Sequence, residues 1–160
     1  YDATLILGAA SDTGDAWGRI EKLNSLEAFS ENRIKDAFSK FLGPIEQVPP
    51  SYSAVKFKGK KLYEFARKGI EIKVAPRKVL IHRLDISKID GLEVSFNVTC
   101  SKGTYIRQLC IDLGKTLGCG AYLSRLRRTR SGDFIINEAS TLEELKNFDM
   151  QTLKNKLRVR

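Results

Sequence analysis

Several features that define particular classes of protein are missing from this 160-residue sequence. No hydrophobic run approaches the roughly 18 residues that a membrane-spanning helix needs, so we expect no bilayer helix and no membrane partner. The sequence does not open with a basic segment followed by an apolar one, so we expect no secretory leader. Its three cysteines, Cys100, Cys110 and Cys119, cannot all pair and form no C-x-x-C motif, which indicates reduced thiols in a cytoplasmic protein.

Histidine is scarce and the spacing of a calcium-binding loop is missing, which excludes several kinds of site. His82 is the only histidine, so the chain has neither a Ser-His-Asp triad nor a histidine-rich metal site, and we predict no bound metal. Asp12 and Asp15 lack the spacing of a calcium-binding loop, and we interpret them as turn-forming residues.

Two glycine-containing stretches resemble nucleotide-binding loops but lack a required glycine. A phosphate-binding loop ending at Gly114-Lys115 needs a glycine five positions earlier, where Leu109 stands. A dinucleotide fingerprint opening at Gly118 needs its third glycine where Leu123 stands. We therefore predict no nucleotide cofactor.

Methionine is almost absent. Met150 is the only one, and the sequence starts at Tyr1, inside a predicted strand. We therefore expect this chain to be a piece of a longer protein.

The composition is that of an ordinary folded domain, with 42% apolar and 29% charged residues. The pattern predicts strands at 1–9 and 19–23, a helix over 31–42, a long polar loop over 49–61 and a short helix over 62–68. It then predicts a hairpin of strands 77–90 and 92–100, a helix from 104 to 117, a basic strand closed by a glycine turn over 123–134, and a helix starting at Thr141. This order predicts an α+β fold, with a mostly antiparallel mixed sheet flanked by helices.

Some local signals are specific. Ser30 is a plausible N-cap of the first helix and Gly43 its stop, while Thr104 is a plausible cap of the helix over 104–117. Alternate residues from Leu92 to Cys100 are apolar and should face one side, whereas the strand before them slips in phase near His82, which predicts a bulge.

Positive charge is concentrated in two segments. The chain carries 28 Lys or Arg against 19 Asp or Glu, a net charge of +9. Residues 53–83 hold ten basic side chains against two acidic ones, and residues 101–130 hold seven against one, so the rest of the chain is acidic. The segments could be two separate solvated faces. The functional alternative is a phosphate-binding surface formed where they meet in space.

Three stretches together resemble one family. The stretch YDATLILGAASDTGDAWGRI resembles the K-x-Y…LG…T-D-T-x-D-x-x-G segment of TruB-type tRNA pseudouridine synthases. The stretch VPPSYSAVKFKGKKLYEFARKGI is similar to that family's P-x-x-S-A-x-K-x-x-G-x-x-x-Y-x-x-A-R-x-G segment, and the stretch from Cys100 to Phe134 to its GTYIR helix and L-x-R-x-x-x-G-x-F strand. The resemblance runs in order over nearly all of residues 1–138 and implies a partial pseudouridine synthase fold.

The resemblance implies a chemistry and roles for four residues. The family isomerises the uridine at position 55 in the tRNA T loop to pseudouridine, without a cofactor, after flipping that base out of its stack. Tyr1 matches the tyrosine that packs on the flipped ring, and Arg107 the arginine that pairs with the catalytic aspartate. Tyr105 and Leu126 match the residues that line the pocket.

The sequence departs from the family at the nucleophile. The catalytic aspartate belongs to a G-T-L-D-P-like motif upstream of K-x-Y, and that motif is absent from these residues. Asp12 and Asp15 lie in the predicted turn and Asp112 in the middle of a helix, so none of them matches. We therefore predict that a missing N-terminal segment or a second polypeptide carries the nucleophile, and that this chain alone is inactive.

The resemblance also assigns the basic residues and the domains. Residues 51–69 correspond to a thumb-like insertion that closes on the T stem-loop of tRNA, the expected partner. His82, in a strand amid Lys and Arg, is interpreted as a surface or RNA-facing residue. We expect residues 1–148 to be the central and later part of the catalytic domain and 149–160 to start a C-terminal extension. The predicted RNA-binding residues are Lys56, Lys58, Lys60, Lys61, Arg67, Lys102, Arg127 and Arg128.

Two other functions compete with the enzyme. A non-catalytic module that grips tRNA T loops would carry the same basic segments. A G-x-L-D motif ahead of Tyr1 would favour the enzyme over that module. A generic DNA-binding domain is disfavoured because the sequence shows no helix-turn-helix with a basic second helix and no zinc-ligand spacing.

Overall fold

The computed structural model describes residues 1–23 and 30–157. By contacts the chain divides into two compact units, Tyr1–Arg127 and Arg128–Arg160, and each is described by itself. The predicted domain boundary at 148/149 refers to the domains of the family and stays a prediction.

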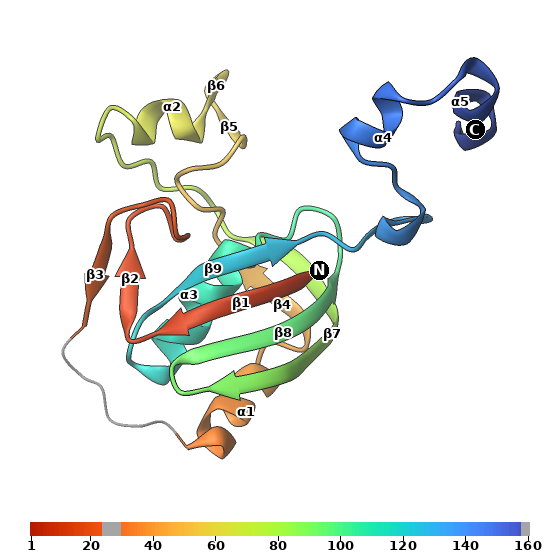
Figure 1. The fold of residues 1–160 in the computed structure, drawn as a ribbon. Coiled ribbons are helices and arrows are strands. Elements are labelled where there is room, and N and C mark those ends of the chain that lie inside the picture. Colours follow the sequence, from red (N-terminus) through yellow and green to blue (C-terminus); the bar gives the residue numbers. More distant parts are fainter. Residues whose placement is uncertain (24–29, 158–160) are drawn as a thin grey trace. The chain divides into compact units, whose positions relative to one another are not determined.

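A five-stranded antiparallel sheet forms the centre of the first unit (Figure 1). Its strand order is β4-β7-β8-β1-β9, with β4 at Gly43–Gln47, β7 at Arg77–Asp90, β8 at Glu93–Cys100, β1 at Asp2–Leu7 and β9 at Ala121–Arg127. A separate hairpin joins β2, Ala9–Ser11, to β3, Ile20–Lys22. The predicted α+β class with a mostly antiparallel sheet is confirmed.

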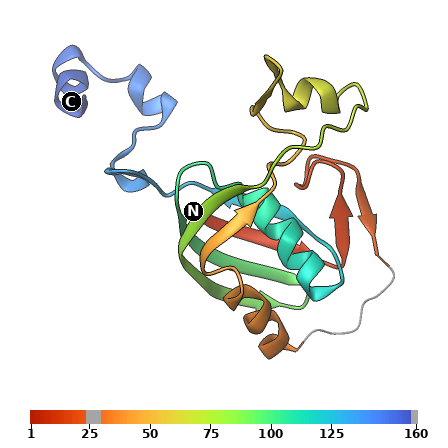
Figure 2. The same ribbon diagram turned by 180° about the vertical axis from the view of Figure 1, so that it is seen from behind.

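Two helices cover one face of this sheet (Figures 1 and 2). They are α1, Glu31–Ser39, and α3, Ile106–Leu117. The apolar sides of both helices pack on alternate apolar residues of the strands, so the core lies between the sheet and the helix layer. The buried apolar residues of α3 are Ile106, Leu109, Cys110, Leu113 and Leu117. The sheet places Val94, Phe96 and Val98 in the same core.

Several local predictions are confirmed. The Ser30 side chain accepts a hydrogen bond from Arg33 N and caps α1. The register between β7 and β8 shifts between Ile81 and Arg83, where the sequence predicted a bulge, and His82 is exposed there. A second shift, between Ile86 and Lys88, was not predicted.

Three element boundaries were predicted wrongly. The helix predicted over 31–42 ends at Ser39, and the strand predicted over 1–9 breaks at Gly8, which has a positive φ of 78°. The strand β4 was not predicted at all. Thr104 does not cap α3, because its hydroxyl donates to the Ser101 carbonyl and Tyr105 is the N-cap residue.

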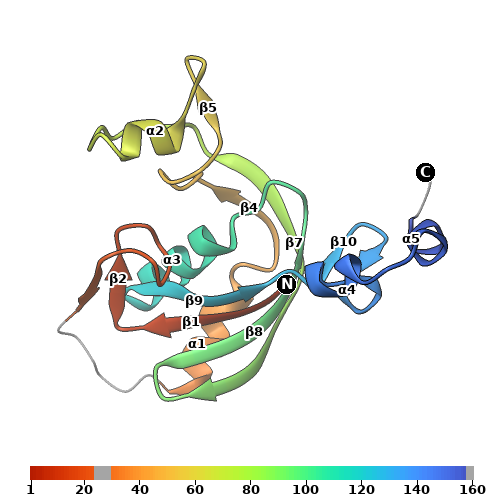
Figure 3. The ribbon, with the colours of Figure 1, turned by 45° about the horizontal axis from the view of Figure 1, so that its top comes forward.

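The stretch predicted as a long loop contains a small hairpin and leads into a helix. Strands β5, Lys56–Phe57, and β6, Lys60–Lys61, pair with each other, and α2, Leu62–Ala66, follows. Phe57 and Phe65 pack edge to face, and Leu62 is buried. These elements stand away from the sheet (Figure 3), so we call residues 51–69 the basic insertion.

The second unit is built from short elements. These are the hairpin of β10, Arg130–Ser131, and β11, Phe134–Ile135, the 3₁₀ turn Ile136–Glu138, and the helices α4, Leu142–Lys146, and α5, Met150–Lys156. Thr141 starts α4 as predicted and forms a reciprocal capping box with Glu144. No helix in the described part of the chain is long and apolar enough to cross a membrane.

Candidate functional site

The turn between β2 and β3, residues 11–19, is held closed by its own side chains. The Asp12 carboxylate accepts from Arg19 N at 2.9 Å, and the Ser11 hydroxyl donates to the Asp15 carbonyl at 2.6 Å. Gly18 has no space for a side chain, because a Cβ there would lie 2.2 Å from Asp12 Oδ1 and 2.4 Å from Thr13 Oγ1. The predicted turn is therefore a tightly packed polar structure with little freedom to move.

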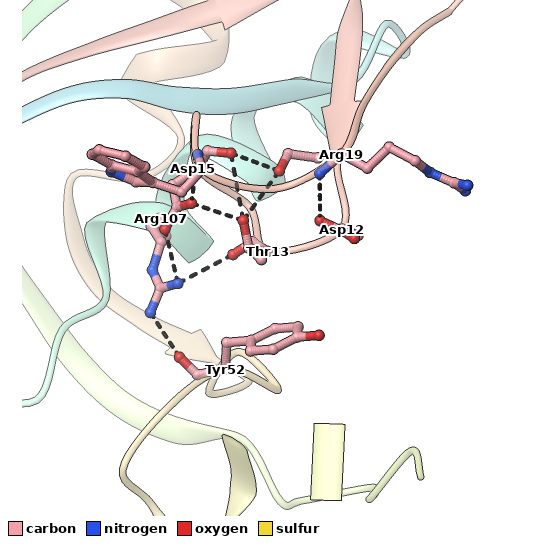
Figure 4. Close-up of polar contacts among 8 residues, drawn as sticks. Asp12, Thr13, Asp15, Arg19, Tyr52 and Arg107 are labelled. Carbon is pink, nitrogen blue, oxygen red and sulfur yellow. Dashed lines mark hydrogen bonds and ion pairs between the residues drawn. The ribbon is translucent and has the colours of Figure 1, made fainter. Parts of the chain in front are cut away.

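Asp15 stands at the centre of this turn, with both carboxylate oxygens engaged (Figure 4). Its Oδ1 accepts from Thr13 Oγ1 at 2.7 Å and from Trp17 N at 3.1 Å. Its Oδ2 accepts from Arg107 Nη1 at 3.0 Å. The two side chains of this ion pair are only 21% and 23% exposed, so the pair is partly shielded from solvent and from salt.

Arg107, in the first turn of α3, connects three segments that are far apart in sequence (Figure 4). Besides Asp15, its Nη1 donates to the Thr13 carbonyl at 3.2 Å and its Nη2 to the Tyr52 carbonyl at 2.7 Å. Gly14 permits the close approach of the turn to α3, since a Cβ on it would lie 2.8 Å from Ile111 Cδ1, and its φ is +79°. The guanidinium is thereby fixed in place.

The same contacts tie the basic insertion to Arg107. Tyr52, whose carbonyl accepts from Arg107, precedes Ser53, whose carbonyl accepts from Tyr63 N in α2 at 3.1 Å. Leu62 N donates to the Val55 carbonyl at 2.8 Å. A short stretch of backbone therefore runs from the guanidinium to the helix of the insertion.

The start of α3 is held by a side chain from β4. The Gln47 amide donates to the Tyr105 carbonyl at 3.1 Å and accepts from Tyr105 N at 2.8 Å. Gln47 is only 2% exposed. The Tyr105 N–H has no partner within the helix, and the bond to Gln47 satisfies it. The two bonds hold Tyr105 directly at the start of α3.

Tyr1 and Leu126 lie on the face of the sheet that α3 covers. Ala3 is buried in the core and pairs with Leu126 across β1 and β9, and paired residues point to the same side of a sheet. Tyr1, two positions from Ala3, shares that side and packs against the core. Leu126 is 47% exposed, as a residue at a pocket rim would be.

The predicted catalytic residues gather at one end of the sheet. Tyr1 is hydrogen bonded to Val98 in both directions, at 2.8 and 2.9 Å, and α3 starts a few residues after β8 ends at Cys100. Tyr105 and Arg107 thus begin their helix at the end where Tyr1 stands. We propose below that these residues share one pocket.

The predicted RNA-binding side chains are exposed, and most lie on the basic insertion. In the insertion, lysine and arginine groups lie near aromatic rings, with Lys61 and Arg67 at 5.5 and 5.2 Å from the Tyr63 ring. Arg127 ends β9 and Arg128 opens the second unit. The exposed basic residues are Lys56, Lys58, Lys60, Lys61, Arg67, Lys102, Arg127 and Arg128.

Two cavities border these elements. One of about 330 Å³ lies between the turn and residues 48–52, over α3, and its wall includes Thr13, Tyr52 and Lys115. The other, of about 600 Å³, lies along β1, β8 and β9 and includes Leu126 and Arg127. The first adjoins the two backbone carbonyls that hold Arg107.

Two groups on α3 have shifted pKa values. Burial raises the pKa of Asp112, although hydrogen bonding from Gln108 opposes the shift. Burial also raises the pKa of the Cys110 thiol, so this cysteine stays protonated and unreactive. In the described part of the chain no group of three His, Cys, Asp or Glu side chains could hold a metal ion.

Sequence reasoning missed the contact between Asp15 and Arg107. Asp15 was interpreted as turn-forming, which is correct, but its carboxylate also accepts from Arg107. Its place in the T-D-T-x-D stretch of the family pattern was the available signal. Gln47 gave no signal, since nothing in the sequence indicates its reach to Tyr105.

Comparisons with known proteins show which family this chain resembles. Residues 1–106 match the model of the TruB family pseudouridylate synthase N-terminal domain, and 107–159 that of the tRNA pseudouridylate synthase B C-terminal domain. Relatives named tRNA pseudouridine synthase B are 51% identical in Clostridium acetobutylicum and 50% in Syntrophus aciditrophicus, each over 91% of this chain. The chain spans about half the length of these relatives, 50% and 46%.

Solved structures agree as well. A chain in the crystal structure of a Cbf5-Nop10-Gar1 complex is 27% identical over 98% of this chain and 37% of its own length, with a TM-score of 0.66. A chain of an H/ACA RNP bound to a substrate RNA containing 2′-deoxyuridine, 23% identical, covers 98% of this chain and 36% of its own with a TM-score of 0.62, and shows the same fold. With family models matched along nearly its whole length, this chain belongs to the TruB family of pseudouridylate synthases.

Proposed function

We propose that this chain supplies the central part of the catalytic domain of an enzyme that isomerises uridine to pseudouridine at position 55 in the T loop of tRNA. Family membership supports pseudouridine formation as the reaction class. The names of the relatives support tRNA as the substrate. The observation that carries the proposal is the fixed guanidinium of Arg107 at the start of α3.

Arg107 has donors to spare for a second carboxylate. A guanidinium carries five N–H groups, and the three hydrogen bonds described above use two on Nη1 and one on Nη2. Within the described residues, Nε–H and one Nη2–H have no hydrogen-bond partner. Asp15 and the two carbonyls orient the guanidinium, and its remaining donors can hold the catalytic aspartate ionised and in position.

The other site residues form the walls of the uridine pocket. Tyr1 packs on the flipped uracil ring, an interaction worth roughly 1–3 kcal/mol for stacked aromatic side chains. Tyr105 and Leu126 line the pocket from the start of α3 and the end of β9. No cofactor takes part, because the isomerisation involves no net oxidation or reduction. The carboxylate acts at the nucleotide as the bond to N1 breaks, the released uracil rotates and bonds through C5, and the C5 proton leaves while N1 gains one.

The basic insertion binds the phosphates of the T stem-loop. Its lysines are exposed. Its elements, β5, β6 and α2, stand away from the sheet (Figure 3), which leaves them accessible to an RNA backbone. Phosphate contacts position the RNA, while the unstacked loop bases provide the specificity. A tRNA substrate supports the expectation of a cytoplasmic protein.

The nucleophile comes from outside these 160 residues, and this can be tested directly. A tRNA transcript with tritium at C5 of its uridines releases the label on isomerisation, because C5 becomes the glycosidic carbon. We expect no release with the chain alone. We expect release when the chain is fused to the upstream segment of the Syntrophus aciditrophicus relative. The control fusion carries asparagine in place of the aspartate of the G-x-L-D motif.

The results separate the proposal from its alternative. Release by the chain alone would contradict an external nucleophile. A fusion that binds the T stem-loop tightly but releases no tritium would favour a non-catalytic RNA-binding or RNA-folding module. A fusion that neither binds nor reacts would contradict both functions.

A further inference from the structure

The turn that presents Asp15 also presents an exposed indole. Trp17 is the only tryptophan in the sequence, and 95% of it is exposed to solvent. Tryptophan is usually largely buried in folded proteins, and it is common at binding surfaces, where its large ring supplies most of the contact. An indole left almost wholly in water therefore indicates a binding residue.

The backbone that carries this indole is fixed. Trp17 N donates to Asp15 Oδ1 at 3.1 Å, and Gly18 N donates to the Asp15 carbonyl at 3.3 Å. The next position cannot accept a side chain because Gly18 packs against Asp12 and Thr13. A rigid backbone below a ring with two rotatable bonds loses little entropy when a ligand binds.

The indole is coupled to the proposed site through one carboxylate. Oδ1 of Asp15 holds the backbone of Trp17, and Oδ2 holds Arg107 (Figure 4). Any ligand that reaches Arg107 thus comes close to the turn. The indole is therefore placed to contact whatever surrounds the reacting nucleotide.

The neighbours of Trp17 favour a nucleobase over a protein partner. Protein-binding tryptophans stand among other apolar groups that exclude water. Trp17 instead stands in a polar stretch, Ser11 to Arg19, whose only other apolar side chain is that of Ala16. A single ring in polar surroundings is what stacking on one unpaired base requires, because each base offers an aromatic face and keeps its phosphate in water.

We propose that Trp17 stacks on an unpaired base of the substrate RNA other than the uridine in the pocket. The inference rests on the proposed function, since it places a second loop nucleotide beside the first. Trp17 is then a binding residue that helps to hold the opened loop.

Fluorescence tests the proposal directly, because Trp17 is the only indole. A synthetic RNA hairpin with the tRNA T stem and loop is titrated into the chain, and binding is measured in parallel by calorimetry. We expect the hairpin to quench the emission, and a fully paired duplex of the stem to leave it unchanged. Trp17→Ala should weaken hairpin binding by roughly five- to hundredfold, and Trp17→Phe by less.

A matched control separates stacking from stability. Leu42→Ala removes another exposed apolar side chain, 55% exposed, and should leave both binding and thermal midpoint unchanged. Trp17→Ala should also leave the thermal midpoint unchanged, because the indole makes few contacts in the folded chain.

The outcomes distinguish this inference from the function on which it rests. Hairpin binding with unchanged emission and an unaffected Trp17→Ala variant would overturn the stacking role and leave the proposed function standing. Tryptophan emission that changes with protein concentration in the absence of RNA would also overturn the stacking role, since the indole would then pack against a second copy of the chain. No hairpin binding at all would contradict the proposed function itself.

Discussion

At the scale of single residues, the Arg107–Asp15 pair is the best-defined chemical feature of the chain. Both side chains are about one-fifth exposed, and each makes further hydrogen bonds to the turn or to a carbonyl. Removing one partner of a partly buried ion pair destabilises the protein by more than the intact pair stabilises it, because the remaining charge is left desolvated and unpaired. We propose that the pair positions the guanidinium, and we expect its loss to lower both stability and function.

We expect Arg107→Lys to lower the free energy of unfolding by about 1–3 kcal/mol. A lysine ammonium cannot reach the Asp15 carboxylate and the Thr13 and Tyr52 carbonyls at once with the geometry of a guanidinium. Arg125→Lys is the matched control, because its exposed ion pair with Glu93 should contribute at most about 1 kcal/mol. Urea denaturation measures both. Equal losses of unfolding free energy in the two variants would mean that Arg107 contributes no more than an exposed ion pair does.

Ser53 gives a prediction of the opposite sign. Its Oγ is buried and has no hydrogen-bond partner in the described part of the chain. Ser53→Ala removes an unsatisfied polar group, so the free energy of unfolding should stay unchanged or rise by up to about 1 kcal/mol. Thr4→Val, which removes a buried hydroxyl paired with Ser95 Oγ at 3.1 Å, should lower it by about 0.5–1.5 kcal/mol. Thermal denaturation measures the stability of both variants. A large loss of stability in Ser53→Ala would show that the Ser53 hydroxyl does have a hydrogen-bond partner.

Asp112 makes stability depend on pH in the acid range. Burial raises its pKa above the ordinary 3.8, so the folded state binds a proton more tightly than the unfolded state. Its contribution to stability is therefore largest at low pH and declines as the pH rises from about 3.8 through the raised pKa. Asp112→Asn keeps an acceptor for Gln108 and removes the titration.

The free energy of unfolding of Asp112→Asn, minus that of the parent chain, should therefore grow as the pH rises through this window and then level off. Urea denaturation at a series of pH values measures the difference. A difference that shrinks with rising pH would mean that the carboxylate is stabilised in the folded state.

At the scale of elements, those set by local sequence pattern were predicted well, and those that depend on pairing with distant strands were predicted poorly. Helix α3 and the hairpin of β7 and β8 follow from periodicity and from the Asp90-Gly91 turn, which are contained in short windows. Strand β4 was missed because Gly43 and Pro44 read as a helix stop, and its strand character depends on pairing with β7, far along the chain. Its edge position explains why Pro44 is tolerated.

The candidate site divides in the same way. Tyr1, Tyr105, Arg107 and Leu126 could be named from the family pattern, and the structure places them on three neighbouring elements. The Asp15 partner of Arg107 lies 92 positions away, and the Gln47 clamp on Tyr105 lies 58 positions away. Contacts over such separations depend on the fold, and no local pattern encodes them.

We expect Gln47→Met to loosen the start of α3. The substitution conserves side-chain length but removes both hydrogen bonds to Tyr105, leaving its N–H without an acceptor. The free energy of unfolding should fall by about 1–3 kcal/mol. Hydrogen exchange should quicken most at Tyr105 and in the first turn of α3. Gln151→Met in α5, where the side-chain amide donates to exposed Asn155, is the control. Uniform exchange across α3 would contradict a local clamp.

At the scale of the whole molecule, the two basic segments meet as predicted. Leu80 N donates to the Ser101 hydroxyl at 3.0 Å, and Ser101 N donates to the Leu80 carbonyl at 2.8 Å, which joins residues 53–83 to residues 101–130. Tyr52, one position before the first segment, accepts from Arg107 in the second. These contacts bring the backbones of the two basic segments together within the first unit.

The positive charge of the basic insertion leads to a quantitative prediction about how RNA binding depends on salt concentration. Each phosphate contact releases bound counterions, so the logarithm of the affinity for the T stem-loop should fall linearly with the logarithm of the salt concentration. Replacing Lys56, Lys60 and Lys61 by glutamine removes three exposed charges from the basic insertion and should lower the slope by about two. Replacing Lys22, Lys35 and Lys40, which are also exposed but lie outside the basic segments, changes the net charge by the same amount and should leave the slope unchanged.

Fluorescence anisotropy of a labelled hairpin at several salt concentrations measures the slope for the parent chain and for both triple variants. Equal slopes for the two triple variants would mean that net charge alone drives binding, whereas a slope lowered only in the first would mean that the insertion itself holds the phosphates.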